Sequence, residues 1–173
     1  MILPARYARS LALLSLALML VACAQRMPLP SDTPRLSLPM KLHIQHDQDG
    51  TRDWLLVIQP EGRALRWSLL DPLGIPLARQ LLLDGRWQAD GLLPPNPQAR
   101  ELFVALLFAL TPAEQLADLY SHAAWTLQHD GRTLFDGAAA WHVRYLKDER
   151  IELDVGPALT YRVAPIATAG ARH

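Results

Sequence analysis

The chain has 173 residues, half of them hydrophobic, with 17 lysines and arginines against 17 aspartates and glutamates. This charge balance argues against nucleic acid as a partner, because binding to a phosphate backbone needs a basic surface. Once an N-terminal apolar segment is removed, 151 residues remain. They are enough for one domain with its own core.

Residues 1–22 have the features of a signal peptide. Arg6 and Arg9 precede the apolar run LALLSLALMLVA, which is too short to be a comfortable transmembrane span. The run ends in Leu-Val-Ala-Cys23, which resembles the lipobox of bacterial lipoproteins. The resemblance implies cleavage before Cys23 and acylation of this residue. The alternative is an ordinary secretory signal, with Cys23 near the cleavage site by coincidence.

Ala24 follows the cysteine, where an aspartate would signal retention at the inner membrane. We therefore expect a lipid anchor in the outer membrane, with the domain on its periplasmic face. Residues 23–39 also contain four prolines, which exclude a helix or a central strand. We expect this segment to be a tether between outer-membrane lipid and a domain formed by residues 40–173.

From Met40 the pattern predicts a meander of antiparallel strands. Turn-forming pairs that end in glycine recur about every dozen residues between apolar runs. Leu65, Trp67 and Leu69 alternate with polar side chains, as in a half-buried strand. The expected strands are residues 41–46, 53–59, 64–70, 75–83 and 86–89.

The third and fourth of these strands flank the sequence Asp71-Pro72-Leu73-Gly74. Asp71 and Pro72 suit the first positions of a turn, and Gly74 tolerates a positive φ. This predicts a hairpin with Leu73, followed by Ile75, at its tip. A leucine turned toward solvent requires a covering helix, a partner or a membrane.

Two helices are predicted next. Asn96 can cap the first and Pro97 suits its first position, and residues 102–110 are all apolar. This helix is too short to cross a bilayer and is expected to be buried against the sheet. Residues 111–114, Thr-Pro-Ala-Glu, form a capping-box sequence that predicts the start of the second helix at Thr111.

Alternating apolar residues from His122 onward predict a return to strands. The order of strands, two helices and strands predicts an α+β fold. We expect a single curved antiparallel sheet, a half-barrel, with two or more helices as a lid over an apolar cavity.

Residues from about Met40 to Trp125, together with the lipobox, resemble the LolB family of outer-membrane lipoproteins. The shared features are the strand through Trp67, the turn at residues 71–74, the following strand and the two helices. The resemblance implies a LolA/LolB-like half-barrel that receives acylated lipoproteins from a LolA-like periplasmic carrier and inserts them. It also implies a membrane-insertion loop, in which Leu73 matches the protruding leucine between Pro72 and Gly74.

The chain also resembles a group of proteobacterial lipoproteins encoded with genes for aryl polyene lipid synthesis. This second resemblance implies that the hydrophobic cargo is either the acyl chains of a lipoprotein or a lipid such as an aryl polyene.

The five tryptophans fall on five different predicted strands, and several could line the concave face of the sheet. Indole rings offer a large apolar wall with one polar edge, which suits acyl chains or polyenes. The alternative is that these aromatic residues simply fill the core. The residues expected to line the cavity are Trp54, Leu56, Leu65, Trp67, Leu69, Trp87, Phe103, Leu106, Trp125 and Trp141.

The sequence contains no nucleophile elbow, no phosphate-binding glycine loop and no His-Glu-x-x-His zinc helix. His43 and His46 are three residues apart, which on a strand places them on opposite faces and argues against a metal site. We therefore expect no enzymatic activity, no catalytic residues, no cofactor and no metal.

Three functions remain open. The leading interpretation is an outer-membrane lipoprotein that binds a hydrophobic ligand and helps to transfer it into the membrane. The alternative is a structural or assembly lipoprotein that docks a protein partner through its apolar loop. A hydrolase of acyl or glycosyl bonds is the least supported, because the sequence has no nucleophile motif.

Overall fold

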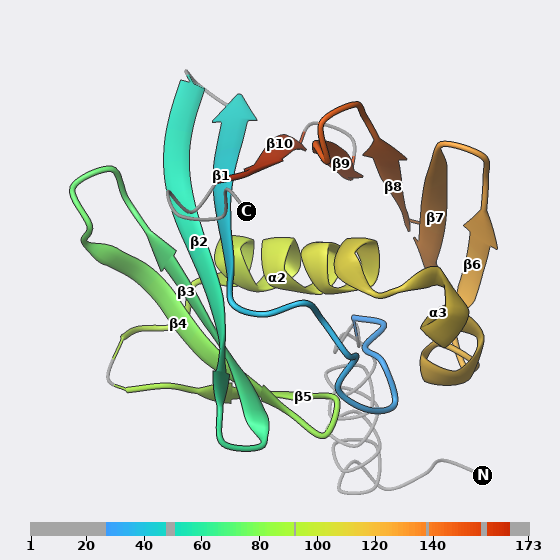
Figure 1. Cartoon of the computed structure of the whole chain (residues 1–173), viewed down its shortest axis with the longest axis horizontal. Coiled ribbons are helices and arrows are strands. Elements are labelled where there is room, and N and C mark those ends of the chain that lie inside the picture. Colours follow the sequence, from blue (N-terminus) through green and yellow to red (C-terminus); the bar gives the residue numbers. More distant parts are fainter. Residues whose placement is uncertain (1–26, 48–50, 92, 138, 157–158, 167–173) are drawn as a thin grey trace, which may run out of the picture.

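The computed structural model describes residues 27–47, 51–91, 93–137, 139–156 and 159–166 (Figure 1). These residues form one antiparallel sheet of ten strands and two helices. The elements in chain order are β1 (Met40–Asp47), β2 (Thr51–Glu61), β3 (Ala64–Leu70), β4 (Pro76–Leu83), β5 (Arg86–Ala89), α2 (Pro97–Leu110), α3 (Ala113–Leu119), β6 (Ala124–Leu127), β7 (Gly131–Asp136), β8 (Ala139–Tyr145), β9 (Ile151–Val155) and β10 (Thr160–Pro165).

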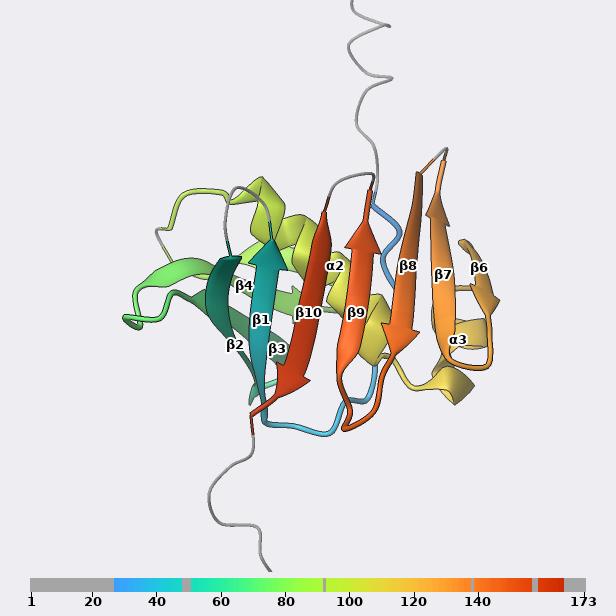
Figure 2. The same cartoon turned by 90° about the horizontal axis from the view of Figure 1, so that it is seen from above.

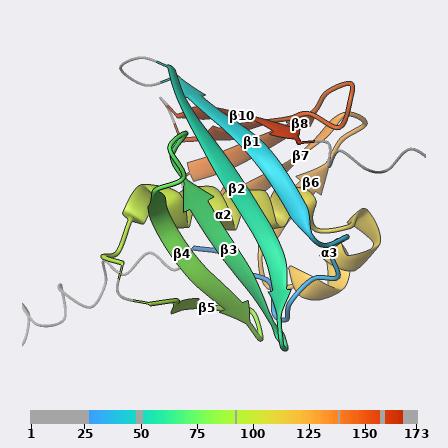
Figure 3. The same ribbon diagram turned by 60° about the vertical axis from the view of Figure 1, so that its left-hand side comes forward.

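The strands are arranged in the order β5-β4-β3-β2-β1-β10-β9-β8-β7-β6. The first and last strands therefore pair in the middle of the sheet, whereas β5 and β6 are its two edges. The sheet curves around α2, as Figures 1 and 2 show from two directions. In Figure 3 the twist of β1 to β4 across α2 is visible. The predicted single curved antiparallel sheet with helices is confirmed, and it is open because its edge strands do not pair with each other.

Strand β2 shows why these sequences form this sheet. Trp54, Leu56 and Ile58 alternate along it and are buried, while Leu55 and Val57 between them are half-buried on the convex side. A two-residue period places one set of side chains against the core. The second set gives the convex side its partly apolar character.

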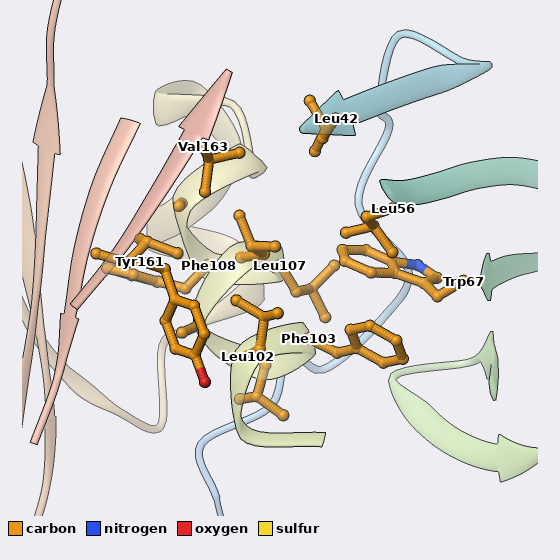
Figure 4. Packing of buried hydrophobic residues seen from close by; sticks show 14 of the residues in the cluster. Leu42, Leu56, Trp67, Leu102, Phe103, Leu107, Phe108, Tyr161 and Val163 are labelled. Atoms are coloured by element: carbon orange, nitrogen blue, oxygen red, sulfur yellow. The ribbon is translucent and has the colours of Figure 1, made fainter. Parts of the chain in front are cut away.

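Helix α2 fills the concave side of the sheet. The Asn96 side chain accepts a hydrogen bond from the backbone N–H of Ala99 at 3.0 Å, and Pro97 occupies the first turn, as predicted. Nine of the fourteen residues of α2 are buried. In Figure 4, Phe103 and Leu107 point toward Trp67 and Leu56, while Phe108 lies near Tyr161 and Val163. Each fully buried side chain of this size contributes about 1.5–3 kcal/mol to folding.

The C-terminal end of α2 is held by side chains from two strands. Arg132 on β7 donates from Nη1 to the carbonyls of Phe108, at 3.0 Å, and Thr111, at 2.8 Å. The hydroxyl of Tyr145 on β8 donates to the carbonyl of Ala109 at 2.7 Å. These bonds satisfy carbonyls that lack a partner within the helix, and the positive charge of Arg132 faces the negative end of the helix dipole.

The prediction that a capping box at Thr111 starts α3 is wrong. The residue before α3 is Pro112, and no side chain caps that helix. The hydroxyl of Thr111 instead donates to the carbonyl of Leu107 at 2.6 Å, and Thr111 ends α2. The Thr111 side chain therefore lies at the end of α2, and α3 begins one residue later, after Pro112.

Residues 27–39, the described part of the predicted tether, form no helix or strand and lie against the domain. The backbone N–H of Ser31 donates to the carbonyl of Leu119 at 2.8 Å. Gly85, in the β4–β5 turn, has a φ of +68°, and a Cβ there would meet the carbonyl oxygen of Pro30 at 2.3 Å. A side chain at position 85 would therefore push this segment away from the sheet.

No single helix among the described residues is long and apolar enough to cross a membrane. Helices α2 and α3 reach the required length and composition only as a pair, and the chain bends by 118° between them.

Candidate functional site

The tip of the β3–β4 hairpin is a rigid turn. One carboxylate oxygen of Asp71 accepts hydrogen bonds from the backbone N–H groups of Leu73, at 2.9 Å, and Ile75, at 2.8 Å. The N–H of Gly74 donates to the carbonyl of Asp71 at 3.0 Å, and Gly74 has a φ of +83°. Aspartate, proline and glycine therefore fix the loop through local contacts, as their positions in the sequence predict.

This turn presents apolar side chains to solvent. The side chain of Leu73 is 84% exposed and that of Ile75 is 56% exposed, and Pro72 and Gly74 beside them are also exposed. The loop extends beyond the neighbouring strands at the left of Figure 2. Leu73 therefore contributes almost no packing to the core.

A pocket of about 740 Å³ lies between the two edge strands of the sheet. It is bounded by β5, β6, β7, the outward side of α2, the loop after α3 and residues 27–29. Its volume is within the range of small-molecule sites, roughly 300–1,000 Å³. The residues that line it are Met27, Pro28, Leu29, Trp87, Arg100, Val104, His122, Ala123, Ala124 and Phe135.

The ten residues expected to line a cavity are gathered around α2, mostly in the core. Eight of them are buried in one cluster: Trp54, Leu56, Leu65, Trp67, Leu69, Phe103, Leu106 and Trp141. Trp87 and Trp125 are partly buried and pack against that cluster. Trp87 lines the pocket, and none of the other nine is among its lining residues.

The aromatic contacts of Trp67 show how closely this core is filled. Its ring centroid lies 5.3 Å from that of Trp87 and 5.4 Å from that of Phe103. Trp87 and Phe103 are themselves 5.7 Å apart. The open space therefore lies on the outward side of α2, beside Trp87.

Sequence reasoning missed most of the pocket, including Arg100, His122 and Phe135. These residues come from α2, the loop after α3 and β7, and they meet only because the curvature of the sheet brings β5 near β6. A local sequence pattern does not report the distance between the two edges of a sheet.

A buried polar cluster connects β1 to α2. His46 is buried and stacks on Trp54 and Tyr161, with ring centroids 5.6 and 4.9 Å away, and its Nε2 lies 3.4 Å from Nε2 of Gln98. Burial raises the pKa of Tyr161 to about 12 and raises the pKa of the Glu101 carboxyl above its ordinary value. The cluster helps to hold the N-terminal half of α2 on the sheet.

His43 and His46 point to opposite faces of β1, as predicted. His43 is half-exposed, and its Nε2 lies 2.8 Å from the Asp53 carboxylate. No group of three or more metal-ligating side chains comes together within the part of the chain that the structure describes.

The predicted lipidation site Cys23 and signal peptide 1–22 lie outside the described residues.

Comparison with protein-family models matches residues 38–162 to the family described as Protein of unknown function (DUF3261). The matched range includes both helices, strands β1 to β9, the hairpin tip and seven of the ten pocket residues. No curated protein matches the chain. Because the match covers well over half of the sequence, the chain belongs to the DUF3261 family.

Proposed function

We propose that this protein is an outer-membrane lipoprotein, anchored through Cys23, that binds a hydrophobic ligand and helps to transfer it into the outer membrane. The ligand is the acyl chains of a lipoprotein or a lipid such as an aryl polyene, received from a LolA-like periplasmic carrier. The observation on which the proposal depends is the rigid hairpin that exposes Leu73. The resemblance of this hairpin and its flanking strands to the LolB family supports the same role.

The geometry of the hairpin suits entry into a bilayer. Moving one leucine side chain from water into the acyl region stabilises the inserted state by about 1.5–3 kcal/mol. The Asp71 hydrogen bonds already hold the turn in place, so insertion requires little additional ordering of the backbone. One leucine gives weak and reversible insertion, which suits a loop that must leave the membrane after each delivery.

The pocket gives a hydrophobic ligand a place beside the apolar core. Its wall is mainly aliphatic and aromatic, as ligand pockets usually are. Each methylene transferred from water contributes about 0.8 kcal/mol, so an acyl chain has ample affinity for such a wall. Transfer of the ligand from a similar apolar site on a carrier to this pocket can then involve little net change in free energy.

Transfer between vesicles tests the proposal. The full-length lipoprotein is reconstituted into acceptor vesicles, and donor vesicles contain a self-quenched fluorescent peptide carrying an acyl chain. The wild type should accelerate transfer over protein-free vesicles. Leu73→Glu should reduce the rate at least tenfold, toward the protein-free value, because a carboxylate resists entering the acyl region.

The matched control is Leu146→Glu, which places the same charge at another exposed leucine, in the β8–β9 turn. It should transfer at the wild-type rate. Normal transfer by Leu73→Glu would remove the loop from the mechanism. Failure of the wild type to exceed protein-free vesicles would favour the alternative, a loop that docks a protein partner.

A further inference from the structure

We infer that the pocket between β5 and β6 binds an anionic amphiphile, a single acyl chain that ends in a carboxylate or phosphate, with Arg100 and His122 contacting the anionic group. This inference rests on the proposed function and adds the chemical class of the ligand and the residues that select it. It follows from the shape of the pocket, from the charges at its wall and from a second pocket beside it.

The wall of the pocket is apolar except at two positions. Eight of the ten lining residues are alanine, proline, leucine, methionine, valine or aromatic. Phe135, the penultimate residue of β7, remains 41% exposed there, although it is a large hydrophobic side chain. An exposed phenylalanine in a concave apolar wall indicates a surface that a hydrocarbon chain covers.

The two polar lining residues are Arg100 and His122, and no acidic residue lines the pocket. The Arg100 guanidinium is exposed and forms no ion pair with any described residue. Arg66 and Arg79, in contrast, both bind the carboxylate of Asp90, at 2.8 and 2.9 Å. Arg100 is therefore a cation without an acidic partner among the described residues, at the wall of an apolar pocket, where a planar guanidinium can bind a carboxylate or phosphate through two hydrogen bonds.

A second pocket of about 130 Å³ adjoins the first, and both include Trp87 and Arg100. The smaller pocket has a larger share of polar lining residues, Arg79, Gln80, Gln88, Asn96 and Arg100, and no acidic side chain. Arg100 thus lies where a mainly apolar space meets one of mixed polarity. This arrangement matches an amphiphile with its chain in the large pocket and its anionic group beside Arg100.

Helix α2 gives the ligand a direction. Arg100 and Val104 are four residues apart and share one face of the helix, and Val104 also lines the large pocket. A chain that starts at Arg100 therefore runs along Val104 toward Phe135 and Ala124. An uncharged head group accepts at most an ordinary hydrogen bond from Arg100, whereas an anionic one forms a stronger, charge-assisted bond that orients the ligand.

Photocrosslinking of the full-length lipoprotein in proteoliposomes tests the inference. Three probes share one acyl chain with a terminal diazirine and differ in their head group, which is a carboxylate, a phosphate or an alcohol. Mass spectrometry maps the crosslinked residues. The carboxylate or phosphate probe should label Phe135 and Ala124, with a yield at least fivefold above that of the alcohol.

Two variants and one control sharpen the test. Arg100→Glu should reduce labelling by the anionic probes at least fivefold, because it places a negative charge beside the anionic group, and should leave labelling by the alcohol probe unchanged. Ala124→Trp fills the pocket from an exposed strand position and should reduce labelling by every probe. Arg86→Glu, an exposed charge reversal on β5 outside the pocket, should label as the wild type does. Circular dichroism confirms that each variant is folded.

Equal labelling by the alcohol, unaffected by Arg100→Glu, would overturn the inference and assign the pocket to an uncharged chain. Labelling of the domain outside the pocket would overturn it as well. Either result would leave the transfer defect of Leu73→Glu in place, and with it the proposed function. Pocket labelling together with normal transfer by Leu73→Glu would instead keep the binding site and reject the hairpin mechanism.

Discussion

Leu73 is almost fully exposed and packs little against the domain, which distinguishes it from the leucines of the core. Leu73→Ala should change the free energy of unfolding by less than about 0.5 kcal/mol, because the side chain is almost fully exposed. Leu56→Ala, at a fully buried position, should cost about 2–5 kcal/mol. Urea denaturation of both variants measures the difference. A large loss in Leu73→Ala would show that the leucine is packed and would contradict its role as an exposed contact.

The raised pKa of Tyr161 predicts that the free energy of unfolding decreases at alkaline pH. Burial raises its pKa to about 12, whereas a tyrosine in the unfolded chain ionises near about 10. Between these values the unfolded state loses the proton first, so the wild type loses stability as the pH rises.

Tyr161→Phe removes the ionisable phenol and with it this loss of stability at high pH. The variant should stay within about 1 kcal/mol of the wild type at pH 8 and be more stable by about 2 kcal/mol at pH 12. Chemical denaturation across this range measures the difference. If the free energies of unfolding of the two proteins change with pH in the same way, the pKa of Tyr161 is the same in the folded and the unfolded chain, which would contradict the prediction.

The environment of a single residue could be predicted from the sequence where it depends on neighbouring residues in the chain. The exposure of Leu73 follows from Asp71, Pro72 and Gly74, all within three residues of it. The place of Arg100 at the pocket wall was not predicted, because it depends on β5, β6 and residues 27–29 meeting around it.

At the scale of elements, α2 is the part that organises the molecule. The carbonyls at its C-terminal end bind Arg132, a buried arginine whose guanidinium also lies 5.6 Å from the ring centroid of Phe108 and 5.0 Å from that of Tyr145. Arg132→Met should destabilise the protein by about 2 to 4 kcal/mol, because two carbonyls lose a charged donor.

The control for this prediction is Arg144→Met on β8, which removes an ion pair between a largely exposed arginine and Glu152. It should cost at most about 1 kcal/mol. Thermal unfolding of both variants makes the comparison. Equal losses would show that the carbonyls of α2 find other partners when Arg132 is removed.

The start of α2 could be predicted from the sequence and the start of α3 could not. Asn96 and Pro97 act within one turn of the chain, so a local pattern is sufficient. Thr111 fits two roles equally well by sequence, as the end of one helix and the cap of the next. The structure shows the first role, because the Thr111 hydroxyl already donates to the carbonyl of Leu107.

At the scale of the whole molecule, the pocket and the hairpin tip belong to one open, curved sheet. Pairing of β1 with β10 leaves β5 and β6 as edges, and the pocket lies between them. Alternation and turn spacing were sufficient to predict a single curved sheet. They did not reveal that α2 occupies the concave side so fully that the pocket forms on its outward side.

Covalent geometry links the proposed anchor to this pocket. Cys23 precedes Met27 by four residues, and Met27 lines the pocket. Four residues span at most roughly 14 Å, so acylation of Cys23 would keep the pocket close to the membrane. The anchor, the pocket and the hairpin tip would then serve the one proposed task, delivery of an amphiphile into the membrane.

The most direct test of the central claim is whether Leu73 enters the bilayer. A Leu73→Cys variant of the full-length lipoprotein is labelled with an environment-sensitive fluorophore in the presence of vesicles, with Leu146→Cys as the matched site and the wild type as the labelling blank. The account predicts a blue shift and quenching by bromine-labelled acyl chains at position 73, and neither at position 146. A probe at position 73 that stays in water would contradict it.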